Sequence, residues 1–163
     1  MKNLIKLSLT LFLGCFLLLG CSGDDDVDIS DQYLTAKIDG ANFVAEPKNS
    51  IQILRNTNGY GTNLYIKGMS IEGDFIEFSV YGYDGPGKYY FGDNYFNNSW
   101  IKYHQISNLE DWESIMDLSN RSNFVEILLI DGGSIEGKFS FNGKSNISGI
   151  SKIVSEGNFK ANY

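Results

Sequence analysis

The chain has 163 residues, with 20 acidic and 13 basic side chains, a formal net charge of −7, 2 cysteines and 1 histidine. Two cysteines are too few for a disulfide scaffold, and the 11 Phe and 10 Tyr among its many apolar residues exclude a disordered chain. The acidic excess speaks against nucleic-acid binding, because phosphate contacts need clustered Lys and Arg. One domain is expected at this length.

The first twenty residues have the pattern of an export signal. Lys2 and Lys6 form a short basic region, and residues 7–20 are almost wholly apolar. A helix over this apolar stretch spans about 21 Å, which is short of the ~30 Å hydrocarbon layer of a membrane. The sequence therefore predicts a signal peptide over residues 1–20 rather than a permanent membrane span.

The end of this segment resembles the cleavage site of a bacterial lipoprotein. Residues 18–21 read Leu-Leu-Gly-Cys, with a small residue directly before the cysteine. We expect cleavage before Cys21 and lipid on its thiol, and several acyl chains together hold a protein on a membrane essentially permanently. Cys15 is a competing site, but cleavage there would leave too short an apolar region. The other alternative is a buried cysteine at the end of an ordinary signal.

An acidic run follows the predicted lipid site directly. It comprises Ser22, Gly23, Asp24, Asp25 and Asp26. A run of acids beside a lipid anchor resembles the surface-export signal of Bacteroidota lipoproteins, which implies the outer face of the outer membrane. The alternative is a solvated spacer that keeps the domain off the lipid headgroups. We assign residues 21–32 to this tether and residues 33–163 to a single domain.

From Tyr33 onward, apolar and polar residues alternate with a period of two. In residues 75–81, Phe-Ile-Glu-Phe-Ser-Val-Tyr, this alternation indicates an antiparallel strand with one buried face. Gly beside Asp, Asn or Glu separates such runs at the spacing of tight hairpins. About ten strands are expected, the last broken near Gly157, over residues 33–38, 42–46, 50–55, 62–69, 74–83, 87–91, 100–105, 123–131, 134–142 and 150–163.

Many short strands at hairpin spacing predict an all-β antiparallel barrel or sandwich, and the sequence leaves both open. One segment departs from the strand pattern. Residues 107–110, Ser-Asn-Leu-Glu, fit a capping box, and Leu109, Trp112 and Met116 recur at helical spacing. We predict one short amphipathic helix over residues 108–118, packed on the sheet or closing an open end. The alternative is a long loop held by Trp112.

Both ends of the domain resemble a family of small Bacteroidota outer-membrane lipoproteins of unknown function. Residues 35–45, Thr-Ala-Lys-Ile-Asp-Gly-Ala-Asn-Phe-Val-Ala, are similar to the hairpin that opens these proteins. Residues 135–141, Ile-Glu-Gly-Lys-Phe-Ser-Phe, and residues 156–163 are similar to their last two strands. Residues 92–122 hardly share the similarity. The family has no assigned activity, so the resemblance implies a fold and a location only.

Residue types for catalysis or metal binding are scarce. His104 is the single histidine, which cannot form a zinc site, and no nucleophile motif accompanies it. No phosphate-binding glycine motif is present, and with so many acids no particular glycosidase pair stands out. A calcium site formed by turn aspartates, Asp84, Asp93 or Asp131, is the alternative to a domain without metal. We therefore predict no enzyme, no cofactor and no metal.

Aromatic residues crowd into residues 81–103, spaced by Gly and Asn. About half of them are expected in the core, and Tyr95, Phe96 and Trp100 are expected at the surface, where aromatics stack on sugars or form protein interfaces. The sequence thus predicts a non-enzymatic interaction or accessory module on a lipid anchor, with a protein or glycan partner. The alternatives are a small-ligand or glycan-binding lipoprotein of an outer-membrane uptake system, and, less favoured, a hydrolase.

Overall fold

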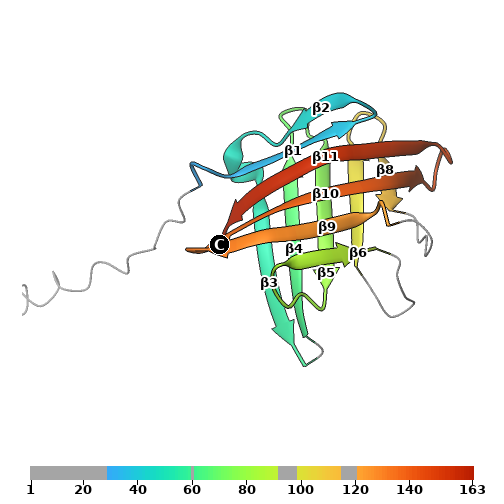
Figure 1. Ribbon diagram of the computed structural model, residues 1–163. Helices are drawn as coiled ribbons and strands as arrows, with labels where there is room; N and C mark the ends of the chain where they lie inside the picture. Colours follow the sequence, from blue (N-terminus) through green and yellow to red (C-terminus); the bar gives the residue numbers. More distant parts are fainter. Residues whose placement is uncertain (1–28, 60, 92–98, 115–120) are drawn as a thin grey trace, which may run out of the picture.

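The computed structural model describes residues 29–59, 61–91, 99–114 and 121–163. Its strands join in one antiparallel sheet of 11 strands that curls into a half-barrel (Figure 1). This confirms the predicted all-β antiparallel class. Within the described ranges, we find no helix with the length and apolar character that crossing a membrane requires.

The strands coincide closely with the expected ranges, because alternation and turn residues define both their faces and their ends. In chain order they are β1 (Tyr33–Ile38), β2 (Ala41–Val44), β3 (Gln52–Asn58), β4 (Gly61–Met69), β5 (Phe75–Tyr81), β6 (Gly87–Tyr90), β7 (Trp100–Gln105), β8 (Glu110–Ser114), β9 (Phe124–Asp131), β10 (Ser134–Ser145) and β11 (Ser151–Asn162).

Strand β10 joins two layers of the half-barrel. It pairs with β11 over Ser134–Lys144, and its other edge pairs first with β9 over Ser134–Ser140 and then with β8 over Gly143–Ser145. From β8 the sheet continues through β7, β5 and β4 to β3, whereas β1 and β2 follow β11. In Figure 1, β1, β11, β10 and β9 run across the view, in front of β3, β4 and β5, which run from top to bottom. The core lies between these layers.

Three phenylalanine rings connect the two layers of the core. The ring of Phe78 on β5 lies 5.7 Å from that of Phe139 on β10 and 5.2 Å from that of Phe159 on β11, measured between centroids. All three side chains are fully buried, and aliphatic residues of β4, β7 and β9 surround them. Each such side chain contributes on the order of 1.5–3 kcal/mol when it leaves water.

Two glycines make room for these rings. Gly137 on β10 pairs directly with Phe159 on β11, and Phe139 pairs with Gly157. A Cβ atom at Gly137 would lie 2.5 Å from Phe159 Cζ, and one at Gly157 would lie 2.5 Å from Phe139 Cδ2. Each phenylalanine ring therefore covers the glycine on the opposite strand. A larger residue could not replace either glycine unless the backbone moved.

The expected break near Gly157 is a β-bulge inside a continuous strand. The register of β11 against β10 shifts between the pairs Phe139–Gly157 and Phe141–Val154, and Glu156 has a φ of 52°. A bulge places one extra residue in β11 and bends the strand. Hydrogen bonding between β10 and β11 continues beyond the bulge. The strand is therefore bent rather than broken.

The predicted helix over residues 108–118 is wrong for its described part. Glu110–Ser114 form strand β8, which pairs with β7 on one edge and with β10 on the other. Glu110 and Trp112 are buried while Asp111 and Glu113 are exposed, which is the alternation of a strand. Pairing on both edges satisfies the backbone groups that a helix would bond internally, so tertiary pairing overrides the local helical spacing. Residues 115–118 lie outside the described ranges.

Candidate functional site

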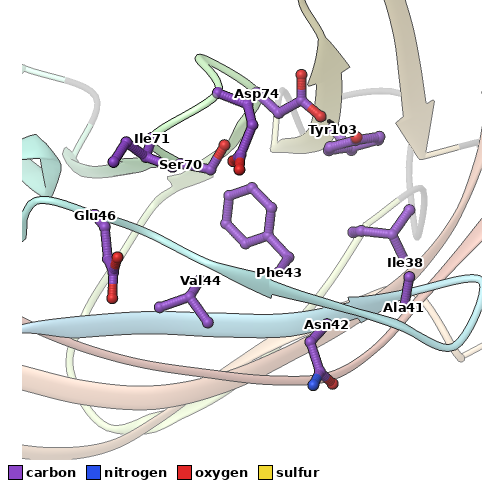
Figure 2. Close-up of a pocket in the computed structure, with 11 residues that line it drawn as sticks. Ile38, Ala41, Asn42, Phe43, Val44, Glu46, Ser70, Ile71, Asp74 and Tyr103 are labelled. Atoms are coloured by element: carbon purple, nitrogen blue, oxygen red, sulfur yellow. Dashed lines mark hydrogen bonds between the residues drawn. The ribbon is translucent and has the colours of Figure 1, made fainter.

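A pocket of about 440 Å³ lies at one end of the half-barrel. Its walls come from the β1–β2 hairpin, the turn between β4 and β5, and Tyr103 of β7 (Figure 2). Its volume is within the ~300–1,000 Å³ that small-molecule sites occupy. This pocket is the candidate functional site.

The β1–β2 hairpin supplies the apolar wall. Its turn residues Asp39 and Gly40 have φ values of 50° and 87°, the left-handed geometry that suits a two-residue hairpin. Strand β2 has only four residues, of which Phe43 faces the core and Val44 is exposed. The Phe43 ring meets the Tyr103 ring edge-on at a centroid distance of 6.3 Å. The hairpin thus closes the end of the core with an aromatic pair.

The β4–β5 turn supplies the polar wall. The Ser70 N–H donates to the Asp74 carbonyl at 2.7 Å, and the Gly73 N–H donates to the Ser70 carbonyl at 3.0 Å. Gly73 has a φ of 94°, which closes the turn at little steric cost. The turn thereby holds the side chains of Ser70 and Asp74 beside each other at the pocket, with Glu72 between them in sequence.

Asp74 and Tyr103 form a fixed pair in the wall. The Tyr103 hydroxyl donates to Asp74 Oδ2 at 2.7 Å, and the Ile106 N–H donates to Asp74 Oδ1 at 2.9 Å. Burial of Tyr103, followed by this hydrogen bond and the nearby carboxylate charge, raises the pKa of its hydroxyl well above the ordinary value. The Tyr103 ring also stacks on Trp112 at 5.7 Å between centroids. The pair therefore ties the β4–β5 turn to β7.

Ser70 carries a buried hydroxyl that the folded chain does not satisfy. The residue is 7% exposed, and its Oγ has no hydrogen-bond partner. Figure 2 shows Ser70 next to Ile71 in the turn that forms this wall, and its Oγ has almost no surface accessible from the cavity. A buried polar atom without a partner costs about 1–3 kcal/mol.

The lining of the pocket is acidic. It includes the carboxylates of Glu46, Glu72 and Asp74 and contains no Lys, Arg or His. None of the ion pairs in the described part of the chain involves Glu46 or Glu72. In the ranges that the structure describes, no group of three or more acidic, His or Cys residues could hold a metal ion. Among the described residues, Glu46 and Glu72 thus have no ion-pair partner, whereas Asp74 accepts two hydrogen bonds from the chain.

A second pocket, of about 320 Å³, also lies along the β1–β2 hairpin and shares Asn42, Phe43 and Val44 with the first. Its charged residues are Lys37 and Glu156, whose Nζ and Oε2 atoms form an ion pair at 2.8 Å. The charges that line it are thus already matched within the chain. The first pocket is the one in which carboxylates lack a cation.

Trp100 is the one predicted surface aromatic that the structure describes; Tyr95 and Phe96 lie outside the described ranges. Trp100 begins β7 and is half-buried on the outer face of the sheet, where its ring lies 6.2 Å from that of Tyr65. The Lys102 ammonium lies 5.6 Å from the centroid of the Trp100 ring. Trp100 therefore does not contribute to the pocket, and the aromatic patch stays a prediction.

The predicted lipid site and acidic run also lie outside the described ranges. They are Cys21, Ser22, Gly23, Asp24, Asp25 and Asp26. The described chain begins near the end of the predicted tether, where Asp31 forms an ion pair with Lys160 and accepts a hydrogen bond from Asn162 Nδ2 at 2.7 Å. The last residues of the tether are thus fastened to the end of β11.

His104 lies on the outer face, away from the pocket. Its Nδ1 is 2.7 Å from Asp111 Oδ1, and its ring stacks on Phe75 at 4.6 Å between centroids. Of the aspartates considered for calcium, Asp84 accepts a hydrogen bond from the Tyr89 hydroxyl at 2.7 Å. Asp93 lies outside the described ranges. The structure does not bring His104 or Asp84 to the pocket.

Sequence reasoning missed the residues that form the pocket. Phe43, Ser70, Asp74 and Tyr103 come from three separate segments, and only Phe43 belongs to a motif, the opening hairpin of residues 35–45. The sequence shows a hairpin signal, Asp-Gly at 39–40, and a turn signal, Glu-Gly at 72–73. It does not show that these two turns lie close together in the fold. Comparison of the chain with protein-family models, curated proteins and solved structures finds no match. Function must therefore be inferred from the residues themselves.

Proposed function

We propose that this chain is a non-enzymatic, lipid-anchored module of the outer cell surface that binds a small ligand in the pocket beside the β1–β2 hairpin. The observation that carries the proposal is the pocket of about 440 Å³, which has an apolar wall on the β1–β2 hairpin and a polar wall on the β4–β5 turn. Pockets that hold small molecules combine apolar walls with a few polar groups that orient the ligand. Phe43 and Val44 provide apolar walls here, and the exposed side chains of Asn42, Glu46 and Glu72 provide such polar groups.

The state of the polar side chains favours binding over catalysis. A general acid or base must exchange a proton with a substrate within hydrogen-bond reach. Asp74 already accepts two hydrogen bonds from the chain, and the raised pKa of Tyr103 keeps its hydroxyl protonated. Glu46 and Glu72 are exposed, without the burial that tunes a catalytic carboxylate. The pocket therefore offers recognition groups and a rigid wall.

The anchor is supported by the signal-like segment before Cys21, and the tether that follows it joins the fold at the start of β1. Strand β1 begins next to the tether and ends at the β1–β2 turn, six residues later, which corresponds to about 20 Å of strand. The hairpin turn at the pocket is thus separated from the anchored end by the length of a strand. The pocket also extends back along the hairpin to Val44, which pairs with Thr35 near the start of β1.

Replacing Cys21 with Ala is expected to abolish labelling by radioactive palmitate and to release the protein from the membrane fraction. The reason is that the acyl chains on this thiol supply the membrane affinity. The control is Cys15→Ala, which is expected to leave both labelling and fractionation unchanged. Continued labelling of the Cys21 variant would contradict the anchor.

Small-molecule binding is tested by methyl NMR of the full chain in detergent with a library of fragments. Val44 and Ile71 are exposed and line the pocket, so their methyl signals are expected to shift when fragments bind. Leu54, which is 63% exposed on β3, is the matched control and is expected to stay unchanged. Shifts of equal size at all three residues, or none at Val44 and Ile71, would argue against a pocket that binds ligands.

A further inference from the structure

Two neighbouring turns of the half-barrel expose aliphatic side chains to water. The β7–β8 turn, residues 106–109, reads Ile-Ser-Asn-Leu, and the β10–β11 turn, residues 146–150, reads Asn-Ile-Ser-Gly-Ile. Their four large aliphatic residues, which we call the apolar rim, are between 43% and 78% exposed: Ile106, Leu109, Ile147 and Ile150. Neither turn contains a charged residue, although the chain as a whole is acidic.

Polar side chains next to the rim bond to one another. Glu110, which is 8% exposed, accepts hydrogen bonds from Asn108 Nδ2 at 3.1 Å and from the Ser148 hydroxyl. The buried Ser145 hydroxyl oxygen accepts hydrogen bonds from the N–H groups of Ile147 and Ser148, each at 3.1 Å. This network holds the two turns together. Its groups would keep their partners if an apolar surface covered the rim, so that little hydrogen bonding would be lost on leaving water.

Leu109 is held in a conformation that leucine rarely adopts. Its φ of 54° lies in the left-handed region, where the Cβ atom of a bulky residue is crowded. Its side chain is mostly exposed, so packing inside the domain does not compensate for this strain. Glycine would adopt the same conformation without the crowding. A leucine that is both strained and exposed indicates a contact outside the folded chain.

The rim is too small to hold two copies of the chain together. Four aliphatic side chains offer on the order of 300–500 Å², whereas a stable interface buries about 800 Å² on each partner. A bilayer sets no such minimum for a protein that is already anchored to it, because the anchor keeps the rim at a high local concentration. Binding to the bilayer interface scales instead with the apolar area that enters it.

The proposed anchor and the rim can reach the same bilayer. Figure 1 shows the β10–β11 turn on the right and the entry of the chain into β1 on the left. Lys160 of β11 pairs with Tyr33 at the start of β1, and Ser151, beside the rim, precedes Lys160 by nine residues, or about 30 Å of strand. The first described residue, Ile29, follows Cys21 by eight residues, and an extended chain of that length spans at most about 29 Å. The two lengths match.

We infer that the apolar rim docks on the lipid surface to which the chain is tethered, with its four side chains among the acyl chains just below the headgroups. This inference rests on the proposed lipid anchor and adds a second contact between the domain and the membrane. Because the two turns contain no charged residue, the contact does not depend on anionic lipid. Together the two contacts fix the orientation of the domain relative to the membrane.

The test measures how deeply a spin label enters the membrane. Ile147→Cys on the rim and Leu54→Cys on β3 are each labelled with a nitroxide in the lipidated protein, which is reconstituted in phosphatidylcholine vesicles. Leu54 is the matched control because it is also aliphatic and 63% exposed. Power-saturation EPR compares collisions of the label with oxygen, which concentrates among acyl chains, and with a water-soluble nickel chelate. We expect the ratio of oxygen to nickel collisions to be severalfold higher at residue 147 than at residue 54, and to stay the same when anionic phosphatidylglycerol is added.

Variants in the Ile147→Cys background assign the contact to the rim. Leu109→Ser combined with Ile150→Ser is expected to shift the equilibrium between the docked and the free label about a hundredfold toward the free label, since each buried aliphatic side chain contributes about tenfold or more. Leu54→Ser combined with Leu128→Ser removes two exposed leucines outside the rim and should leave the equilibrium unchanged.

Leu109→Gly separates docking from folding. It is expected to weaken docking about tenfold. Its unfolding temperature should stay the same or rise, because glycine relieves the strained φ. A leucine with a purely structural role would give the opposite result, which is a lower unfolding temperature and unchanged docking.

Equal collision ratios at residues 147 and 54, or equal effects of the two double variants, would overturn the inference. Magnetic coupling between labels at residue 147 that grows with protein concentration in the absence of vesicles would overturn it in favour of a second copy. If Cys21 takes up palmitate and the label at residue 147 stays in water, the anchor stands and only the docking fails. If Cys21 takes up no palmitate and the label still enters added vesicles in a Cys21→Ala background, the anchor is wrong and the lipid contact of the rim stands.

Discussion

Replacing Phe78 with Ala is expected to lower the free energy of unfolding by about 3–5 kcal/mol, the range for a buried aromatic truncated to a methyl group. Phe78 is fully buried, and its ring contacts those of Phe139 and Phe159, so it joins the back layer of the half-barrel to the front layer. The rigid strands on both sides cannot collapse into the space that its ring leaves. Denaturant-induced unfolding followed by tyrosine and tryptophan fluorescence measures the change.

Leu54→Ala is the matched control for this experiment. Leu54 is a large apolar side chain on β3, but it is mostly exposed, so its removal is expected to change stability by no more than about 0.5 kcal/mol. The Phe78 variant should unfold at a lower denaturant concentration, with little change in the slope of the transition. A loss below about 1 kcal/mol for Phe78→Ala, or equal losses for both variants, would contradict a core that depends on this aromatic contact.

Alanine at Gly137 or at Gly157 is expected to destabilise the fold by about 2–3 kcal/mol or more, although each change adds a single methyl group. At Gly137, the new Cβ would lie 2.3 Å from the Glu126 carbonyl oxygen; at Gly157, it would lie 2.5 Å from the Phe139 carbonyl oxygen. Backbone atoms cannot rotate away, so strands β9, β10 and β11 would have to separate locally. Overpacking of this kind typically costs 1–3 kcal/mol and occasionally more.

Gly59→Ala controls for the general effect of replacing glycine. A Cβ at Gly59 would meet no heavy atom within 4 Å, and so this variant is expected to be as stable as the parent or slightly more stable. Thermal unfolding of the three variants under identical conditions makes the comparison. If Gly137→Ala and Gly157→Ala unfolded at the same temperature as Gly59→Ala, the packing of Phe159 on Gly137 and of Phe139 on Gly157 would be wrong.

The sequence predicted most strands because their signals are local. A period of two sets which face of a strand is buried, and Gly beside Asp or Asn ends the strand at a turn. Residues 33–38 and 100–105 match β1 and β7 at both ends. The strand β8 was missed because its sequence also fits a helix. Only its pairing with β7 and β10 decides between the two, and the sequence does not display that pairing.

The pocket could not be predicted in the same way. Phe43 stands in the predicted opening hairpin and Tyr103 in the aromatic-rich stretch of residues 81–103, but no sequence signal marks Ser70. Their meeting depends on how far the sheet curls and on the β1–β2 hairpin lying over the β4–β5 turn. The missing partner of Ser70 Oγ is likewise a property of the folded neighbourhood. No spacing along the chain encodes either feature.

The amino-acid sequence by itself determined the all-β antiparallel class and most of the strand ranges, because alternation and turn chemistry act between near neighbours. Tertiary structure alone decided the half-barrel, since this depends on β10 pairing with β8 and β9 along one edge while β11 occupies the other. It also decided the strand at residues 110–114 and the acidic pocket, because both result from contacts between segments that are distant in the chain and close in space.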